Sequence, residues 1–71
     1  MNDEDEYLLA RWKRMHQEKA SKALQAFFAV TQQRASQMFQ NPKLTHAQRK
    51  LLTIYFGLPP ALRDAFFPEL K

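Results

Sequence analysis

The chain contains no cysteine, and this absence excludes one group of stabilising devices. Neither a disulfide nor a cysteine-ligated zinc ion can hold the 71 residues together. The two histidines, His16 and His46, stand far apart in the sequence without an acid at ligand spacing, so no metal site is expected. The fold must therefore come from packing and hydrogen bonding, and no cofactor is predicted.

Glycine and β-branched residues are scarce as well. The chain has one glycine, and its β-branched residues are Val30, Ile54 and three threonines. Strands favour β-branched side chains and alternate apolar with polar positions, and no such run is visible here. We therefore predict an all-α fold, a compact bundle of four to five short helices. At this length it forms one domain, residues 1–71, near the size at which a single core is marginal and oligomerisation helps.

Further absences exclude functional classes. No apolar run approaches the ~18 residues of a transmembrane helix, and no signal-peptide pattern is present, which predicts a soluble cytoplasmic protein without a membrane partner.

The sequence also lacks the residue patterns of a catalytic site. It has no glycine-rich phosphate loop, and its paired carboxylates are confined to the N-terminal cluster. No serine or threonine combines with a base and an orienting group. We therefore expect neither an enzyme nor a binder of small molecules.

Negative charge is rare beyond the N-terminus. Positions 3–6 are all acidic, whereas residues 7–63 contain ten lysines and arginines and one acid, Glu18, which leaves this body at +9. A basic surface attracts polyanions over roughly 8 to 10 Å. A nucleic acid is therefore the first candidate partner, and a surface that serves solubility is the alternative.

The segment SKALQAFFAVTQQRASQMFQN, residues 21–41, has the pattern of two short helices joined by a tight turn. Apolar residues three and four positions apart define one face of each helix. Thr31 follows the turn and is a good N-cap, because its hydroxyl can accept from the backbone N–H of Gln33 or Arg34. The apolar faces consist of Leu24, Phe27 and Phe28 on the first helix and of Ala35, Met38 and Phe39 on the second.

The other face of the second helix carries glutamines and no acid. An ordinary solvated face mixes Glu and Lys in pairs. A glutamine tip offers one acceptor and two donors, which match the N7 and N6 edge of adenine in the major groove. Alternatively, glutamine serves only as a neutral helix former on a surface. The face comprises Gln32, Gln33, Ser36, Gln37 and Gln40, with Arg34 as its one cation.

The run VTQQRASQMFQN resembles the recognition helix of the helix-turn-helix Cro and repressor proteins of lambdoid phages and of XRE-type regulators. The resemblance implies a helix-turn-helix at residues 21–41 within a DNA-binding domain. It departs from the family at Ala29, where the turn usually has glycine; a positive φ there costs on the order of 1 kcal/mol. It also departs at Gln25, whose polar tip would need a partner between the helices, and at Ala35, which replaces a larger apolar residue. Base contacts are implied for Thr31, Gln32, Gln33, Ser36 and Gln37.

The resemblance also implies contacts to the DNA backbone. Lys19 and Lys22 lie at the start of the helix whose N-terminus faces a phosphate in the family. Lys43 lies in the loop after the second helix, and Arg34 adds a fourth cation. A solvated lysine pair is the alternative for Lys19 and Lys22. The implied function is that of a sequence-specific regulator of transcription, a Cro-like repressor that binds a palindromic operator in double-stranded DNA as a homodimer.

The N-terminal residues 1–6 are expected to form an acidic, frayed start that complements the dipole of a helix from about Asp3 to Gln17. Leu8, Trp12 and Met15 give this helix its apolar face, with Trp12 against Phe27 or Phe28. The break before the next helix is weakly signalled. Ser21 is a possible N-cap, and one continuous helix is the alternative.

A fourth helix is expected from about His46 to Phe56. Asn41 and Gly57 are expected to end the helices before them in a left-handed conformation, and Thr45 to cap the fourth helix. Its predicted apolar stripe comprises Leu44, Ala47, Leu51, Leu52, Tyr55 and Leu58, with Gln48, Arg49, Lys50 and Thr53 outside.

The tail, LPPALRDAFFPELK, predicts a short helix from Pro60 that stops at Pro68. Adjacent phenylalanines cannot point the same way on a helix. The tail therefore closes the core or offers Phe66, Phe67 and Leu70 to a second subunit. The alternative to DNA binding is a small helical module whose apolar tail or acidic head docks on a larger protein, such as a polymerase or a phage or plasmid assembly.

Overall fold

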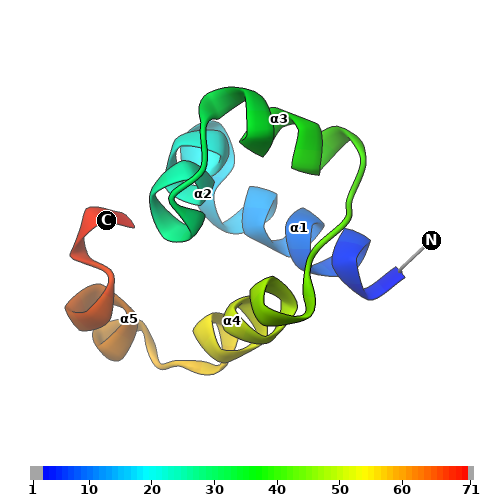
Figure 1. Ribbon diagram of the computed structural model, residues 1–71. Coiled ribbons are helices and arrows are strands. Elements are labelled where there is room, and N and C mark those ends of the chain that lie inside the picture. The colour runs from blue at the N-terminus through cyan, green and yellow to red at the C-terminus, as the bar shows by residue number, and fades with distance from the viewer. Residues whose placement is uncertain (1–2, 71) are drawn as a thin grey trace.

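The computed structural model describes residues 3–70, which fold almost entirely into helices, without a strand in that range (Figure 1). The predicted all-α fold is therefore confirmed. None of the helices in this range is both long and apolar enough to cross a membrane. The elements are α1 (Asp3–His16), the 3-10 turn η1 (Gln17–Lys19), α2 (Ala20–Phe28), α3 (Gln32–Gln40), α4 (His46–Gly57), α5 (Pro60–Phe66) and the 3-10 turn η2 (Pro68–Leu70).

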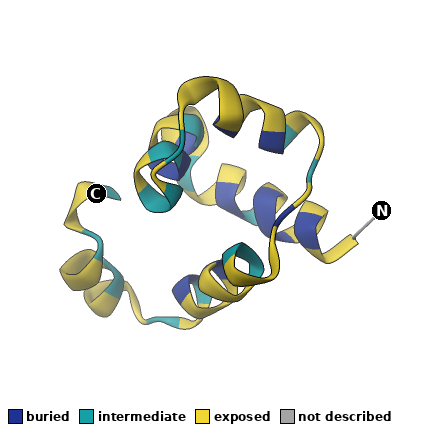
Figure 2. Cartoon of the chain, viewed as in Figure 1, coloured by how far each residue is buried: buried dark blue, intermediate teal, exposed yellow. Residues whose placement is uncertain are grey.

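Trp12 of α1 lies at the centre of the core and is fully buried. Its Nε1 donates to the carbonyl of Ala20 at 2.9 Å, so its polar atom is satisfied. Its ring centroid lies 5.1 Å from that of Phe27 and 5.2 Å from that of Tyr55, which confirms the predicted contact with Phe27. Figure 2 shows how the buried positions of α1 to α4 face one another. The buried apolar residues are Leu8, Leu9, Trp12, Ala20, Ala23, Leu24, Ala35, Met38, Leu44, Leu52 and Tyr55.

The chain breaks between α1 and α2 through η1, so the alternative of one continuous helix is wrong. Gln17 adopts a positive φ of 50°, a conformation that ends α1. The N-cap position of α2 is Lys19, without a side-chain hydrogen bond, and Ser21 lies inside the helix. The prediction of Ser21 as N-cap is therefore wrong. Its hydroxyl instead accepts from Gln25 Nε2 at 3.5 Å, the partner that Gln25 was expected to need.

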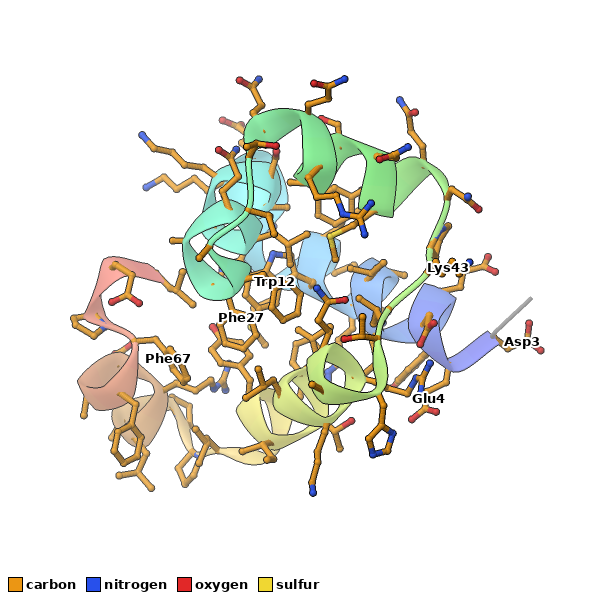
Figure 3. The ribbon with its side chains drawn as sticks, viewed as in Figure 1. Asp3, Glu4, Trp12, Phe27, Lys43 and Phe67 are labelled. Atoms are coloured by element: carbon orange, nitrogen blue, oxygen red, sulfur yellow. The ribbon has the colours of Figure 1, made fainter. Side chains whose placement is uncertain are left out.

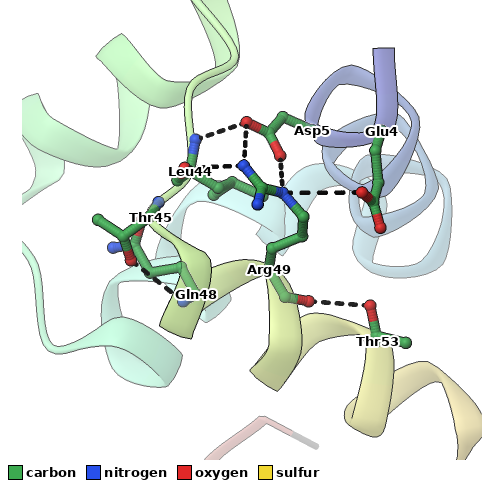
Figure 4. Close-up of polar contacts among 7 residues, drawn as sticks. All are labelled: Glu4, Asp5, Leu44, Thr45, Gln48, Arg49 and Thr53. Carbon is green, nitrogen blue, oxygen red and sulfur yellow. Dashed lines mark hydrogen bonds and ion pairs between the residues drawn. The ribbon is translucent and has the colours of Figure 1, made fainter. Parts of the chain in front are cut away.

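The first turn of α1 is ordered by an ion pair between the buried Asp5 and the partly exposed Arg49 (Figure 4). Asp5 is 1% exposed; its Oδ1 accepts from Arg49 Nε at 2.7 Å, and its Oδ2 accepts from the Leu44 N–H at 2.9 Å. Because a buried carboxylate is stable only when it is paired, Arg49 turns inward. The expectations of a frayed start at residues 3–6 and of an outward Arg49 are therefore wrong; residues 1 and 2 lie outside the described range.

Helix α4 begins as predicted and ends differently. Thr45 Oγ1 accepts from the Gln48 N–H at 3.1 Å while Gln48 Oε1 accepts from the Thr45 N–H at 3.0 Å, a complete capping box. Gly57 is the last helical residue and has no positive φ, and Asn41 has φ −132°, so neither is a left-handed terminator. Both helices end because a proline follows, since the residue before proline is driven to extended conformations.

The apolar stripe of α4 is only partly buried. Leu52 and Tyr55 face the core, whereas Leu51 is 47% exposed and Ala47 is exposed. On α1, similarly, Leu9 is buried while Met15 is 37% exposed. The predicted stripes were therefore wrong at Ala47, Leu51 and Met15.

The tail closes one side of the core. The ring centroid of Phe67 lies 5.2 Å from that of Phe27 and 5.4 Å from that of Tyr55, and Leu70 packs against the same cluster. Figure 3 shows Phe67 directed toward Phe27. Of the three residues expected at a dimer contact, Phe67 and Leu70 are thus packed in their own chain, and Phe66 is 65% exposed.

Candidate nucleic-acid interface

A three-residue turn, residues 29–31, sets the angle between α2 and α3. Ala29 ends α2 in the left-handed conformation, with φ 55° and ψ 47°. The Val30 N–H then donates to the Gln25 carbonyl at 3.1 Å. Thr31 is extended, and its Oγ1 accepts from the Arg34 N–H at 3.2 Å, which confirms the predicted N-cap.

The buried side of α3 fixes which residues face outward. Ala35 is fully buried and Met38 is 2% exposed, while Phe39 packs at the edge of the core. These residues form the predicted apolar stripe, and the small side chain of Ala35 allows the backbone of α3 to lie close to the core. The remaining positions of α3 are exposed along one edge of the molecule (Figure 2).

The glutamines of α3 form one continuous polar surface, which we call the glutamine face. It is a shallow hollow of about 500 Å³ and contains no charged residue. Gln40 belongs to it, although sequence reasoning assigned it no contact. Its spacing from Gln33 and Gln37, seven and three positions, predicted its place on this side of the helix. The glutamine face comprises Gln32, Gln33, Ser36, Gln37 and Gln40. Thr31 is exposed beside it, and its hydroxyl serves as the helix cap.

The predicted phosphate contacts Lys19, Lys22, Arg34 and Lys43 are all exposed, as this role requires. Arg34 lies against the glutamine face, since its Nη1 is 3.5 Å from Gln37 Oε1. Lys43 lies in the loop after α3 and lines the same hollow as Asp3 (Figure 3), so that carboxylate offsets part of its positive potential.

A further cation comes from α1. The Lys13 Nζ lies 5.6 Å from the ring centroid of Phe39, which places an ammonium beside the C-terminal half of α3. Sequence reasoning missed Lys13, because only the packing of α1 against α3 brings it there. Within residues 3–70, no three histidine or acidic side chains gather to hold a metal ion.

No family model matches the chain, and comparisons with curated proteins and with solved structures also gave no match.

Proposed function

We propose that the protein is a sequence-specific double-stranded DNA-binding regulator that inserts α3 into the major groove. The observation that carries the proposal is the glutamine face, an exposed helical surface with several amide tips and no carboxylate. Such tips can both donate to N7 and accept from N6 of adenine. An acid on this face would repel the phosphates on either side of the groove, and none is present on it.

The roles of individual residues follow from their positions. Gln32, Gln33 and Gln37 would contact base edges, Ser36 would assist them, and Thr31 would hold the N-terminus of α3 while its O–H remains able to donate. Lys19, Lys22 and Arg34 would bind phosphates, with Lys43 and Lys13 at the other end of α3. These cations would provide most of the affinity and its salt dependence, without sequence information. Repression of transcription by a dimer on a palindromic operator rests on the sequence resemblance.

Selection of bound duplexes from a random DNA pool, at two salt concentrations, tests the proposal. We expect one enriched motif, and we expect Gln33→Ala to relax the preference at a single base pair by ~1–3 kcal/mol. Lys22→Ala should weaken binding to all sequences and lower the salt slope by about one. Lys50→Ala also removes one positive charge, but from α4, and serves as the control for Lys22→Ala. Enrichment of no motif, with retention lost at the higher salt, would refute sequence-specific recognition.

Exposed apolar side chains favour the second candidate, a module that docks on another protein. Leu51 and Ile54 on α4 and Leu62 and Phe66 on α5 are between 44% and 65% exposed. If the protein is such a module, substitution of Gln33 should leave binding to the partner protein unchanged, whereas substitution of Phe66 should abolish it.

A further inference from the structure

Gln40, the last residue of α3, points outward as directly as Gln33 does. Successive residues of a helix are rotated by about 100° around its axis. The direction opposite to the two buried residues of α3 therefore passes about 10° from Gln33 and about 10° from Gln40. Gln37 lies about 50° from that direction and Gln32 about 90°. The two glutamines that face outward most directly thus lie near the two ends of the helix.

The side-chain amides of Gln33 and Gln40 are available to a ligand. Both residues are exposed, and within residues 3–70 neither amide makes a hydrogen bond. Gln37, by contrast, already accepts from Arg34 Nη1 at 3.5 Å. Each of the two amides can therefore pair with N7 and N6 of one adenine without giving up a partner in its own chain.

No acid interrupts the surface that joins these two residues. The exposed residues in the C-terminal half of α3 are Ser36, Gln37 and Gln40, and Asn41 follows them. If only the N-terminus of α3 met DNA, its C-terminal half would be an ordinary solvated face, on which Glu and Lys are mixed. The uncharged amides found there favour contact with a polyanion along the whole length of the helix.

A cation lies at the C-terminal end of α3 as well. The Lys13 Nζ is held 5.6 Å from the ring centroid of Phe39, and Lys13 lines one hollow of about 410 Å³ together with Gln40. The C-terminus of a helix carries partial negative charge. A duplex that lies against this end therefore needs a cation beside it, and Lys13 supplies one. Glu6, the acid that lines the same hollow, lies two turns of α1 from Lys13, about 10 Å along the axis.

We infer that Gln40 is a further base-reading residue and that α3 lies lengthwise in the major groove, with Lys13 at a phosphate beside its C-terminal end. This inference rests on the proposed function and deepens it, because it sets how many base pairs one α3 reads. Seven residues of helix span about 10.5 Å, about three base-pair steps of ~3.4 Å. Gln33 and Gln40 would therefore contact bases two to three pairs apart. Helix α4 lies on the opposite edge of the molecule (Figure 1), so it does not obstruct a duplex along α3.

Selection from a random duplex pool with the wild type, Gln33→Ala and Gln40→Ala tests the inference. We expect Gln40→Ala to relax the preference at one base pair by about 5- to 150-fold. This pair should lie about two to three positions from the pair that Gln33→Ala relaxes. Gln40→Arg should change the preferred base at the same pair to guanine, because the arginine fork pairs with O6 and N7 of guanine. Circular dichroism verifies that each variant keeps its helix content.

Two substitutions separate base reading from charge. Ala47→Arg adds the same charge as Gln40→Arg at an exposed position of α4, and it should leave the enriched motif unchanged. Lys13→Ala should weaken binding to all sequences alike and lower the salt slope by about one, without a change of motif.

The outcomes distinguish this inference from the proposed function. If the wild type enriches a motif that Gln33→Ala relaxes, while Gln40→Ala leaves every position unchanged, the inference is overturned and the proposed function stands. Equal weakening of all sequences by Gln40→Ala would place Gln40 at a phosphate and overturn it too. Relaxation of neighbouring pairs by Gln33→Ala and Gln40→Ala would contradict the lengthwise placement. Enrichment of no motif by the wild type would refute the proposed function and this inference with it.

Discussion

Asp5 and Arg49 are 44 positions apart in the sequence, and Arg49 Nε donates to Asp5 Oδ1 at 2.7 Å. The Arg49 Nη2 also donates to the Leu44 carbonyl at 3.3 Å, so the pair joins α1, α4 and the loop between α3 and α4. The hydrogen bond from Arg49 holds the pKa of Asp5 below its usual value, against the opposing effect of burial. This contact fixes one end of the molecule.

Asp5→Ala should therefore lower the free energy of unfolding by about 2 kcal/mol, because the buried Leu44 N–H loses its acceptor and the partly exposed Arg49 guanidinium keeps only the Leu44 carbonyl and Glu4 as partners. Urea denaturation followed by circular dichroism measures the change. Asp3→Ala, one of the exposed acids of the same turn, should cost less than about 1 kcal/mol. Equal losses in the two variants would show that the first turn needs only negative charge.

Stability should depend on pH through His16. Burial lowers the pKa of His16 below 6.5, and the positive charge of Arg63 acts in the same direction. The unfolded chain therefore takes up this proton at a higher pH than the folded chain, so the free energy of unfolding should fall as the pH drops below about 6.5. In His16→Gln, urea denaturation at about pH 7.5 and 5.5 should no longer show this decrease in the free energy of unfolding. An unchanged decrease in the variant would assign it to another group. The contribution of Asp5 to the free energy of unfolding should be lost separately, as the pH falls below about 4.

The left-handed residue at the turn offers a stabilising substitution. Ala29 has φ 55°, a conformation that costs an L-residue roughly 1–2 kcal/mol, part of which glycine loses again through its freedom in the unfolded chain. Ala29→Gly should therefore raise the free energy of unfolding by up to ~1 kcal/mol. Ala26→Gly, at an exposed position inside α2, should lower it by ~1 kcal/mol. Thermal denaturation compares the two, and destabilisation by both would contradict the assigned backbone conformation.

The two threonine caps separate stability from DNA binding. Thr31→Ala and Thr45→Ala each remove a hydroxyl that accepts from a backbone N–H at the start of a helix. Each should cost ~1 kcal/mol of stability. Only Thr31→Ala should also weaken DNA binding, because Thr31 positions the glutamine face. Equal DNA affinity of the two variants, measured by fluorescence anisotropy on the selected duplex, would remove Thr31 from the interface.

The features predicted correctly from the sequence depend on residues close together in the chain. The caps Thr31 and Thr45 and the apolar stripe of α3 follow from spacings of three and four positions. The ends of α3 and α4 were predicted to be left-handed, although Pro42 and Pro59 already favoured extended residues before them. This local effect of proline outweighs the preference of asparagine and glycine for a left-handed helix end.

The remaining differences arise from packing between distant segments. Asp5 and Arg49 each look like surface charges in their own helices, and only the approach of α1 to α4 buries Asp5 against Arg49. The position of Lys13 beside Phe39 depends on α1 and α3 in the same way. Helical geometry alone was enough to place Gln40 on the glutamine face, whereas it could not predict these contacts.

Helix α5 provides a further consequence for the motions of the chain. None of its described residues is buried. The segment is attached to the rest of the chain mainly by Phe67 and Leu70, which pack against the core. The Nε of Arg63 also donates to the Leu58 carbonyl at 3.2 Å. Elements with so few buried contacts open locally at free energies well below that of global unfolding. We expect the amides of α5 to exchange with solvent hydrogen faster than those of α1 or α4. Each such opening would briefly uncover Phe27 and Tyr55, the aromatic side chains beneath the tail.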